Sequence, residues 1–295
     1  MAAMESTRAD LSRAVVIGAG TMGAGIAEVC AKAGLSTRLY DVSEAQLEQA
    51  RATIERSLAR AIDKGKIAPD AAAAAAARIE RTTALDAAEA DLVIEAVPET
   101  MRLKKELFAR VGAENPGAIL ASNTSSLSVT EIAAATPGPH RVIGLHFFNP
   151  PPVMPLLEIV RAEQTDEAVL ERALAFAAAA AKQPIVVKDR PGFATSRLGI
   201  VLGMEAIRML ETGVASVEDI DKAMTLGYRH PMGPLELTDL VGLDVRLAIA
   251  EHLTRELGPQ FAPPPLLRQM VRAGRLGRKS GEGFYRWEDG RKAPR

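Results

Sequence analysis

The chain has 295 residues, which is enough for one large core or two ordinary domains. Its 47% hydrophobic and 25% charged residues are typical of a globular protein, and a formal net charge of −1 excludes a global basic field that would attract nucleic acid or anionic lipid. Aromatic residues make up only 4%, which argues against a base-stacking surface. We therefore expect no nucleic-acid partner.

The single cysteine, Cys30, excludes an intrachain disulfide and fits a reducing compartment. The N-terminal stretch MAAMESTRADLS carries acids and lacks the apolar segment of a secretory signal. The most apolar run, Ala173–Ala181, is too short to span a bilayer. We expect a cytoplasmic protein that does not bind membranes.

Strands and helices are predicted to alternate through the first half of the chain, which favours a mostly parallel sheet. Short apolar runs predict strands at Arg13–Ile17, Thr37–Tyr40, Asp91–Glu95, Ala118–Ser122, Val142–Leu145 and Leu156–Val160. Helices are predicted at Thr21–Ala33, Ser43 to about Lys64, Pro69–Ala77 and Glu99 to about Val111. Seven alanines, 71–77, end the third helix and indicate a filler segment without chemistry.

The pattern changes after the apolar run Pro184–Val187. Beyond Gly192 we predict no strand. Helices are predicted there at Arg197–Leu210, Val217–Leu226, Leu243–Leu257 and Leu266–Arg272. The segment KDRPG, Lys188–Gly192, is typical of a domain boundary. The sequence therefore predicts an α/β domain over residues 1–187 and an all-helical domain over residues 188–295.

A glycine-rich segment joins the first predicted strand to the first predicted helix. Residues 18–23, GAGTMG, match the dinucleotide-binding pattern G-x-G-x-x-G. Gly18 would allow the tight turn, Gly20 the close approach of the pyrophosphate, and Gly23 the close packing of helix on strand. Thr21 and Met22 begin the helix, whose free N–H groups and positive dipole end favour an anion.

An acid ends the second predicted strand. Asp41 follows Gly23 by 18 residues, where a carboxylate accepts from an adenosine ribose hydroxyl and repels a 2′-phosphate. This position predicts NAD rather than NADP, a preference that Arg38 nearby weakens only mildly. The alternative, a glycine-rich turn with a surface acid, is disfavoured by the predicted strand and helix on either side.

A histidine and an acid twelve residues apart form the candidate catalytic pair. His146 follows the predicted strand VIGL within LHFFNP, and histidine is the side chain suited to proton transfer near neutral pH. Glu158 lies in the apolar strand LLEIV, where a carboxylate needs a partner. We expect Glu158 to orient His146; the alternative is a merely packed histidine. Structural or surface roles are expected for His140, His230 and His252.

Hydroxyl side chains cluster after the fourth predicted strand, in SNTSS at residues 122–126. Such a cluster either binds a substrate oxygen or caps the helix that follows, and the pattern alone leaves both open. The sequence contains no G-x-S-x-G motif and no Cys/His or His-x-x-x-His spacing, so we expect neither covalent hydrolysis nor a metal site.

Together these segments resemble the L-3-hydroxyacyl-CoA dehydrogenases, including the 3-hydroxybutyryl-CoA dehydrogenases. The matching segments extend from about residue 13 to 286 and are GAGTMGAGIA, DLVIEAVPE, ASNTSSLSVTEIA, GLHFFNPPPVMPLLEIV, KDRPGF, GYRHPMGPLELTDLVGLD and GRKSGEGFY. LHFFNP with its later glutamate is quite specific. The resemblance implies a Rossmann-like N-terminal domain, a helical C-terminal domain that mediates dimerisation, and NAD as the cofactor.

The resemblance also implies roles by position. His146 is similar to the family's catalytic base, Glu158 to its orienting partner, and Ser125 to the serine that contacts the substrate's 3-oxygen. Family positions that contact NAD are occupied by Glu99, Lys104, Asn149 and Lys279. Family positions that touch CoA are occupied by Ser57 and Lys64, which by residue type alone would form a solvated helix face.

One position departs from the family. The family usually has an asparagine after PGF that supports the substrate carbonyl, and this chain has Ser196 there. We count Ser196 among the catalytic candidates, with its hydroxyl or a bridging water taking the place of the amide donor.

The expected reaction is the reversible oxidation of an (S)-3-hydroxyacyl-CoA, short-chain such as 3-hydroxybutyryl-CoA, to the 3-oxoacyl-CoA. One alternative is a dehydrogenase of a non-CoA hydroxy acid or sugar acid. Another is a non-catalytic NAD-binding protein, which would have no need of a paired His146 and Glu158. A homodimer is expected through the helical domain, whose apolar positions include Leu198, Val201, Leu202 and Ile207.

Overall fold

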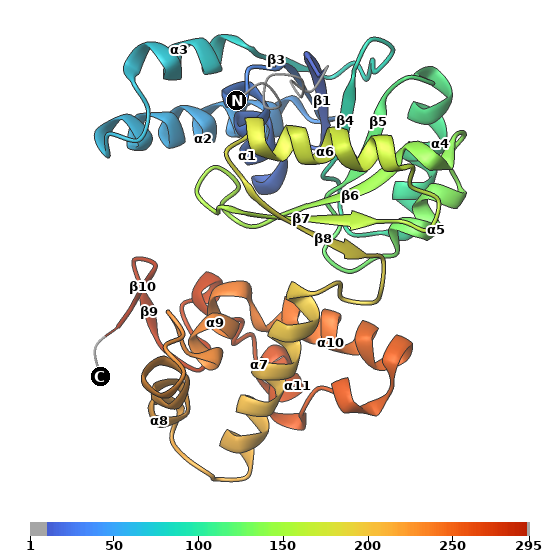
Figure 1. Ribbon diagram of the computed structural model, residues 1–295. Helices are drawn as coiled ribbons and strands as arrows, with labels where there is room; N and C mark the ends of the chain where they lie inside the picture. Colours follow the sequence, from blue (N-terminus) through green and yellow to red (C-terminus); the bar gives the residue numbers. More distant parts are fainter. Residues whose placement is uncertain (1–10, 294–295) are drawn as a thin grey trace, which may run out of the picture. The chain divides into compact units, whose positions relative to one another are not determined.

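The chain divides into two compact units, one ending at Asp189 and the next beginning at Arg190 (Figure 1). The computed structural model describes residues 11–293, so most of the N-terminal stretch for which we predict no secretory signal lies outside the described residues. The first unit is a Rossmann-like sheet flanked by helices and the second is almost wholly helical, which confirms the predicted fold class. Within residues 11–293, no helix is both long and apolar enough to cross a membrane.

The first unit contains an eight-stranded sheet in the order β3-β2-β1-β4-β5-β6-β7-β8. The strands are β1 Arg13–Ile17, β2 Ser36–Tyr40, β3 Ile79–Thr82, β4 Leu92–Glu95, β5 Ile119–Ser122, β6 Val142–Phe147, β7 Leu156–Arg161 and β8 Gln183–Lys188. Strands β1 to β6 pair in parallel, whereas β7 is antiparallel to β6 and β8 is parallel to β7. The sheet is therefore mostly parallel, as predicted, with two reversed strands at one edge.

Helices cover both faces of this sheet. They are α1 Thr21–Lys32, α2 Glu44–Asp63, α3 Pro69–Ala77, α4 Met101–Glu114, α5 Val129–Ala134 and α6 Glu167–Ala179. One core lies between the sheet and helices α1, α2 and α6, and it takes alternate strand residues such as Val16, Ile94 and Phe147. The strand residues between these face the opposite side of the sheet, where α4 packs.

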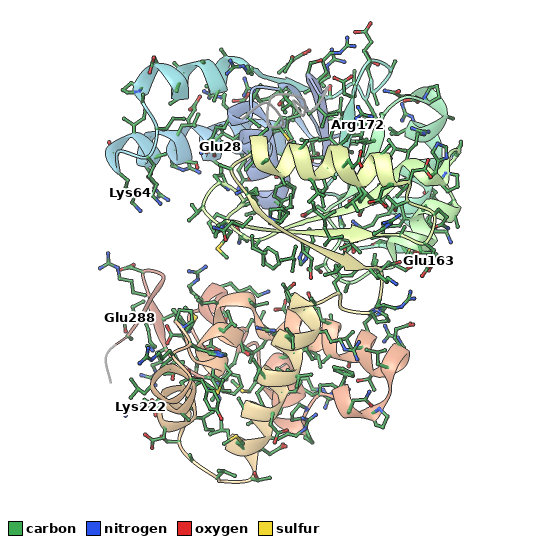
Figure 2. The ribbon with its side chains drawn as sticks, in the orientation of Figure 1. Glu28, Lys64, Glu163, Arg172, Lys222 and Glu288 are labelled. Atoms are coloured by element: carbon green, nitrogen blue, oxygen red, sulfur yellow. The ribbon has the colours of Figure 1, made fainter. Side chains whose placement is uncertain are left out.

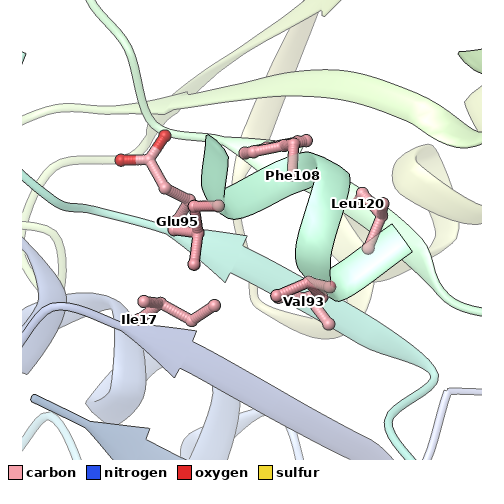
Figure 3. Close-up of a pocket in the computed structure, with 7 residues that line it drawn as sticks. Ile17, Val93, Glu95, Phe108 and Leu120 are labelled. Carbon is pink, nitrogen blue, oxygen red and sulfur yellow. The ribbon is translucent and has the colours of Figure 1, made fainter. Parts of the chain in front are cut away.

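A small cavity separates α4 from the sheet on that opposite side. It is lined mostly by apolar side chains, Phe108 of α4 and Val93 of β4 among them, and its volume is about 10 Å³ (Figure 3). That volume is at the lower limit for one water molecule, so the cavity is a packing gap and not a substrate site. Glu95 also lines it, with carboxylate oxygens that turn away from Ile17 and Val93 (Figure 3).

Two features of the sheet correct the prediction. Strand β6 continues to Phe147, so His146 lies inside the strand rather than after it, because pairing with β7 extends the ladder. Strand β3 is missing from the prediction because its sequence, IERT, has one apolar residue; it forms by pairing with β2 at the sheet edge. The predicted cap of α2 is present, with Ser43 Oγ accepting from the Gln46 N–H at 3.3 Å.

The second unit packs five helices around its own core. They are α7 Thr195–Glu211, α8 Val217–Lys222, α9 Pro234–Val241, α10 Leu243–Leu257 and α11 Pro265–Arg272. The core is drawn from α7 to α11 and includes Ile207, which is 0% exposed and therefore does not belong to an outer apolar face, contrary to the prediction. Leu198, Val201 and Leu202 of α7 are exposed, as a contact surface requires.

Three details of the second unit differ from the prediction. Helix α8 ends at Lys222 and continues as a π-helical turn, Ala223–Gly227. Helix α9 is missing from the prediction although Pro234 at its first position is a helix-start signal. A short hairpin, β9 Trp287–Glu288 and β10 Arg291–Lys292, contradicts the expectation of no strand after Gly192. Its Asp-Gly turn has positive φ at both residues, the usual geometry of a two-residue hairpin turn.

Candidate active site

The segment after β1 turns sharply into α1. Gly18 has a φ of +103°, a left-handed value that side chains rarely adopt. A Cβ at Gly23 would overlap the Gly18 carbonyl oxygen, whereas a Cβ at Gly20 would meet nothing within 4 Å. Position 20 therefore faces open space in front of α1, whose N-terminus has no side-chain cap. The first-turn N–H groups of α1 are oriented to bind an anion there.

Asp41 follows β2, and its carboxylate links the turn between β2 and α2 to the glycine loop by hydrogen bonds. Its Oδ2 accepts from the Ala19 N–H at 2.8 Å, and its Oδ1 accepts from the Ser43 N–H at 2.9 Å. Each carboxylate oxygen has a further lone pair that can accept from a ribose hydroxyl. Asp41 thus orders the loop and places a negative charge beside it.

Polar side chains from four adjacent strands share one face of the sheet. Side chains alternate along a strand, and the apolar neighbours of these residues belong to the core on the α1 side. The polar residues on the α4 side are Glu95, Ser122, His146 and Glu158. The register places Glu95 opposite Ser122 and His146 opposite Glu158. The carboxyl ends of β4, β5 and β6, where open α/β sheets bind ligands, therefore carry acid, hydroxyl and imidazole groups.

His146 and Glu158 form a buried pair. His146 Nδ1 lies 2.8 Å from Glu158 Oε2, and the two side chains are 9% and 0% exposed. When Nδ1–H donates to the carboxylate, the basic lone pair of the neutral ring is on Nε2. Phe148 packs against the imidazole, with ring centroids 4.5 Å apart, and limits its movement. The contact expected from the sequence is present, and its geometry suits a general base.

Ser125 belongs to a hydrogen-bond network centred on Glu99. Glu99 Oε1 accepts from Thr124 Oγ1 at 2.6 Å and from the Ser125 N–H at 2.9 Å. Its other oxygen lies 3.2 Å from Lys104 Nζ, which contacts Glu95 Oε1 at 2.7 Å. Burial opposes ionisation of Glu99, but the Lys104 charge and these hydrogen bonds outweigh it and lower its pKa. Glu99 is therefore a carboxylate that holds the serine in place.

The hydroxyl cluster at residues 122–126 does not cap the next helix. Helix α5 is capped by Ser128, whose Oγ accepts from the Glu131 N–H at 3.1 Å. Within the cluster, Ser122 Oγ donates to Glu95 at 2.7 Å. Of the two alternatives that the sequence leaves open, helix capping is thus wrong.

Asn149 is exposed in the loop after β6, and the half-buried ammonium group of Lys182 holds that loop. Lys182 Nζ donates to the Pro151 carbonyl at 2.5 Å and to the Met154 carbonyl at 2.7 Å. Burial, with repulsion from Lys32, lowers the pKa of Lys182. These contacts fix the segment that presents Asn149 next to β6.

Comparison with known proteins assigns the chain to a family. The model of the 3-hydroxyacyl-CoA dehydrogenase NAD-binding domain matches residues 13–190, and that of the C-terminal domain matches residues 192–287. The chain belongs to the 3-hydroxyacyl-CoA dehydrogenase family. It is thereby an NAD-dependent oxidoreductase, and the uncapped helix N-terminus, the open Gly20 and the Asp41 carboxylate fit that cofactor.

Relatives of this dehydrogenase match along nearly their whole length. A 3-hydroxybutyryl-CoA dehydrogenase of Mycobacterium tuberculosis is 48% identical over 280 residues, which cover 93% of this chain and 98% of the relative. Human mitochondrial hydroxyacyl-coenzyme A dehydrogenase is 44% identical over 287 residues, covering 92% and 90%. The crystal structure of (S)-3-hydroxybutyryl-CoA dehydrogenase from Ralstonia eutropha superposes with a TM-score of 0.90 at 42% identity, covering 95% and 100%.

The remaining predicted site residues of the dehydrogenase lie on other elements. Ser57 is half-buried on α2. Lys64 is exposed at the end of α2 (Figure 2). Ser196, in the first turn of α7, and Lys279, which contacts Asp244 Oδ2 at 2.6 Å, belong to the helical unit.

Glu95 and Lys182 are the polar residues that the sequence analysis missed. Glu95 ends the strand LVIE, and an acid in a buried strand is the same signal that marked Glu158. Lys182 had no such signal, because a lysine between a helix and a strand is usually solvated. Only the fold brings its ammonium group to the carbonyls of a loop 28 to 31 residues earlier.

Two glycine variants in the loop between β1 and α1 distinguish a residue that leaves room for NAD from one that allows α1 to pack closely. Gly20→Ala should leave the melting temperature nearly unchanged but weaken NADH binding by about tenfold or more, since a loss of about 1.4 kcal/mol suffices. Gly23→Ala should cost about 1–3 kcal/mol of folding stability, because the added methyl group overlaps the Gly18 carbonyl. Thermal unfolding and NADH fluorescence titration measure both effects. Equal loss of stability in the two variants would contradict this assignment of the loop.

Proposed function

We propose that the enzyme oxidises short-chain (S)-3-hydroxyacyl-CoA, such as 3-hydroxybutyryl-CoA, to 3-oxoacyl-CoA with NAD, and that the reaction is reversible. The observation that carries this proposal is the buried His146–Glu158 pair on β6 and β7, with Ser122 on the adjacent strand β5 and Glu95 one strand further, on β4. The names of the Mycobacterium tuberculosis and Ralstonia eutropha relatives support the four-carbon substrate.

In this mechanism His146 is the general base. Its Nε2 accepts the proton of the 3-hydroxyl, and the bound NAD supplies the hydride acceptor. The Glu158 carboxylate keeps the ring in one orientation and stabilises the imidazolium that forms. Ser125, held by Glu99, donates to the 3-oxygen. In the reverse direction the imidazolium returns the proton to the 3-oxo group.

Recognition of the CoA part is assigned to α2. Ser57 and Lys64 lie seven residues apart, which places them two turns apart on one side of the helix. A lysine ammonium and a serine hydroxyl are suited to phosphate oxygens. On this assignment a hydroxy acid or sugar acid without CoA would lose those contacts and be a poor substrate. A non-catalytic NAD-binding role would leave the buried pair without a purpose.

The test compares acetoacetyl-CoA, longer 3-oxoacyl-CoAs and free acetoacetate as oxidants of NADH. Acetoacetyl-CoA should have the highest kcat/KM. His146→Gln should lower kcat by about 10²–10⁴-fold with little change in NADH affinity, because only proton transfer is removed. Glu158→Gln should cost less but still be large.

His140→Gln, at an exposed position, serves as the control and should behave like the wild type. Turnover near the wild-type value in His146→Gln would refute the mechanism. Preference for free acetoacetate would instead favour a non-CoA hydroxy acid as the substrate class.

Ser196 is proposed to donate to the substrate's carbonyl oxygen in place of the family's asparagine, directly or through a water. Ser196→Ala should then lower kcat/KM for acetoacetyl-CoA by about 10–10³-fold, the effect of losing one preorganised donor. Ser196→Asn should stay within about tenfold of the wild type. Unchanged kinetics in the alanine variant would leave this task to Ser125 and His146.

The enzyme is proposed to be a homodimer joined through the helical unit. Leu198, Val201 and Leu202 leave 65%, 46% and 42% of their surface exposed on one side of α7, as an apolar contact surface requires. Leu202→Glu should give a monomer by light scattering, because a charge would be buried at the contact. Val214→Glu, in the turn after α7, is the control and should remain a dimer. A wild-type monomer would contradict the proposal.

A further inference from the structure

Three charged groups form a cluster between β4 and α4, two of them buried and the third partly exposed. Lys104 Nζ lies 2.7 Å from Glu95 Oε1 and 3.2 Å from Glu99 Oε2. The side chains of Lys104 and Glu95 are each 1% exposed, whereas that of Glu99 is 38% exposed. Two carboxylates thus share one ammonium group, which leaves the cluster with a formal charge of −1.

The contacts of Glu95 match a carboxylate that accepts hydrogen bonds at both oxygens. Oε1 accepts from the Val97 N–H at 2.7 Å and from the Lys104 ammonium group, while Oε2 accepts from Ser122 Oγ at 2.7 Å. The backbone N–H and the ammonium group can only donate, and a carboxylate accepts from all three partners at once. On Glu99, donors from Thr124 and the Ser125 backbone likewise match a carboxylate. The negative charge is therefore a built feature of the fold.

The cluster lies at the carboxyl ends of the strands, the edge at which open α/β sheets bind dinucleotides. Glu95 pairs with Ile17 in the register, so it adjoins the strand that leads into the glycine loop. Glu95 and His146 are on the same face and two strands apart, and Ser122 lies on the strand between them. Strand spacing and residue rise put the Glu95 and His146 backbones roughly 12 Å apart. A nicotinamide ring that reacts beside His146, as proposed above, would lie within reach of the field of this charge.

The two oxidation states of the cofactor differ by one charge at that ring. The nicotinamide of NAD⁺ is a cation, the dihydronicotinamide of NADH is neutral, and the phosphates are the same in both. A fixed negative charge therefore attracts the cationic ring of NAD⁺ more than the neutral ring of NADH. The low dielectric of the buried site strengthens this difference in affinity.

We propose that Glu95 sets the relative affinity of the enzyme for NAD⁺ and NADH, through the net charge that it gives the Glu95–Lys104–Glu99 cluster. This inference rests on the proposed placement of the reaction beside His146. Glu95 is distinguished from Glu99 because its three partners and its burial keep it from touching the cofactor. It acts through the field and through Lys104, as a positioning residue.

The test uses the full-length enzyme without acyl-CoA and measures dissociation constants for NAD⁺ and NADH by calorimetry. Glu95→Gln keeps the shape and the contact with Ser122 but changes the cluster charge from −1 to zero. The ratio Kd(NAD⁺)/Kd(NADH) should rise about three- to tenfold, as expected for a unit charge about 10 Å away at an intermediate dielectric. A purely structural defect would weaken both forms alike and leave the ratio unchanged.

Glu106→Gln is the matched control. Glu106 is on α4, the helix that carries Lys104. It is 58% exposed and pairs with Arg102, so solvent and salt screen its charge. Its ratio should equal that of the wild type. If Glu95→Gln does not fold, Glu99→Gln makes the same change of charge in the cluster at a more exposed side chain, and its ratio should rise in the same direction.

An unchanged or lower ratio in the folded Glu95 variant, or in the Glu99 variant where the first does not fold, would overturn the proposal. An equal rise of the ratio Kd(NAD⁺)/Kd(NADH) in Glu106→Gln would overturn the proposal too, because the loss of any acidic residue would then change the ratio. Failure of the proposed function is distinguishable, since an enzyme that does not use acetoacetyl-CoA can still show the shifted ratio of dissociation constants.

Discussion

The antiparallel pairing of β6 with β7 is the constraint on which the candidate site depends. It places His146 directly opposite Glu158, with their side chains on the same face of the sheet. A shift of one residue in this register would turn Glu158 into the apolar core on the other face and leave an unpaired charge there. The apolar residues on either side of Glu158, which are 0% exposed, prevent that shift. The reversed edge of an otherwise parallel sheet is therefore what creates the candidate catalytic pair.

Buried acids at this edge are tolerated because the fold supplies a donor for each. Glu158 has the His146 ring, and Glu95 has Lys104, Ser122 and a backbone N–H. Removing one partner of such a set costs more than the set contributes, since it leaves a charge without compensation in a low dielectric. The polar network thus fixes which strand ends lie side by side as well as the chemistry that takes place there.

Much of the fold could be predicted from periodicity and turn residues. Strand β1 and helix α3 have their predicted bounds. The bounds of β1 follow from an apolar run that ends at a glycine turn. Those of α3 follow from a run of alanines that begins with a proline. Strand β3 could not be predicted, since its four residues gain their conformation from pairing with β2. The sequence predicts Ile207 on an outer apolar face, but the structure buries it in the core of the second unit. Helix α7 has apolar residues on several sides, and only packing decides which of them are buried.

Parts of the candidate site could be predicted where the sequence context of a residue points to a single function. The glycine loop and His146 are examples. The supporting groups could not. The family resemblance marks Lys104 as an NAD-contact position, but the residue pattern alone does not distinguish it from the other basic residues of α4. Nothing in that pattern predicts that Lys104 is buried while Lys105 beside it is partly exposed and pairs with Glu131. Helical geometry separates the two neighbours, but which side of α4 faces the sheet depends on the whole core.

Asp41 illustrates how cofactor choice becomes tied to the fold. Both of its oxygens accept from backbone N–H groups, of Ala19 in the glycine loop and of Ser43 before α2. Replacing Asp41 with a neutral or basic side chain to admit a 2′-phosphate would remove the repulsion but also untie the loop that binds the pyrophosphate. The gain in contact with the extra phosphate would be offset by the cost of ordering that loop on binding. We therefore expect the carboxylate's structural task to maintain a preference for NAD over NADP as much as its charge does.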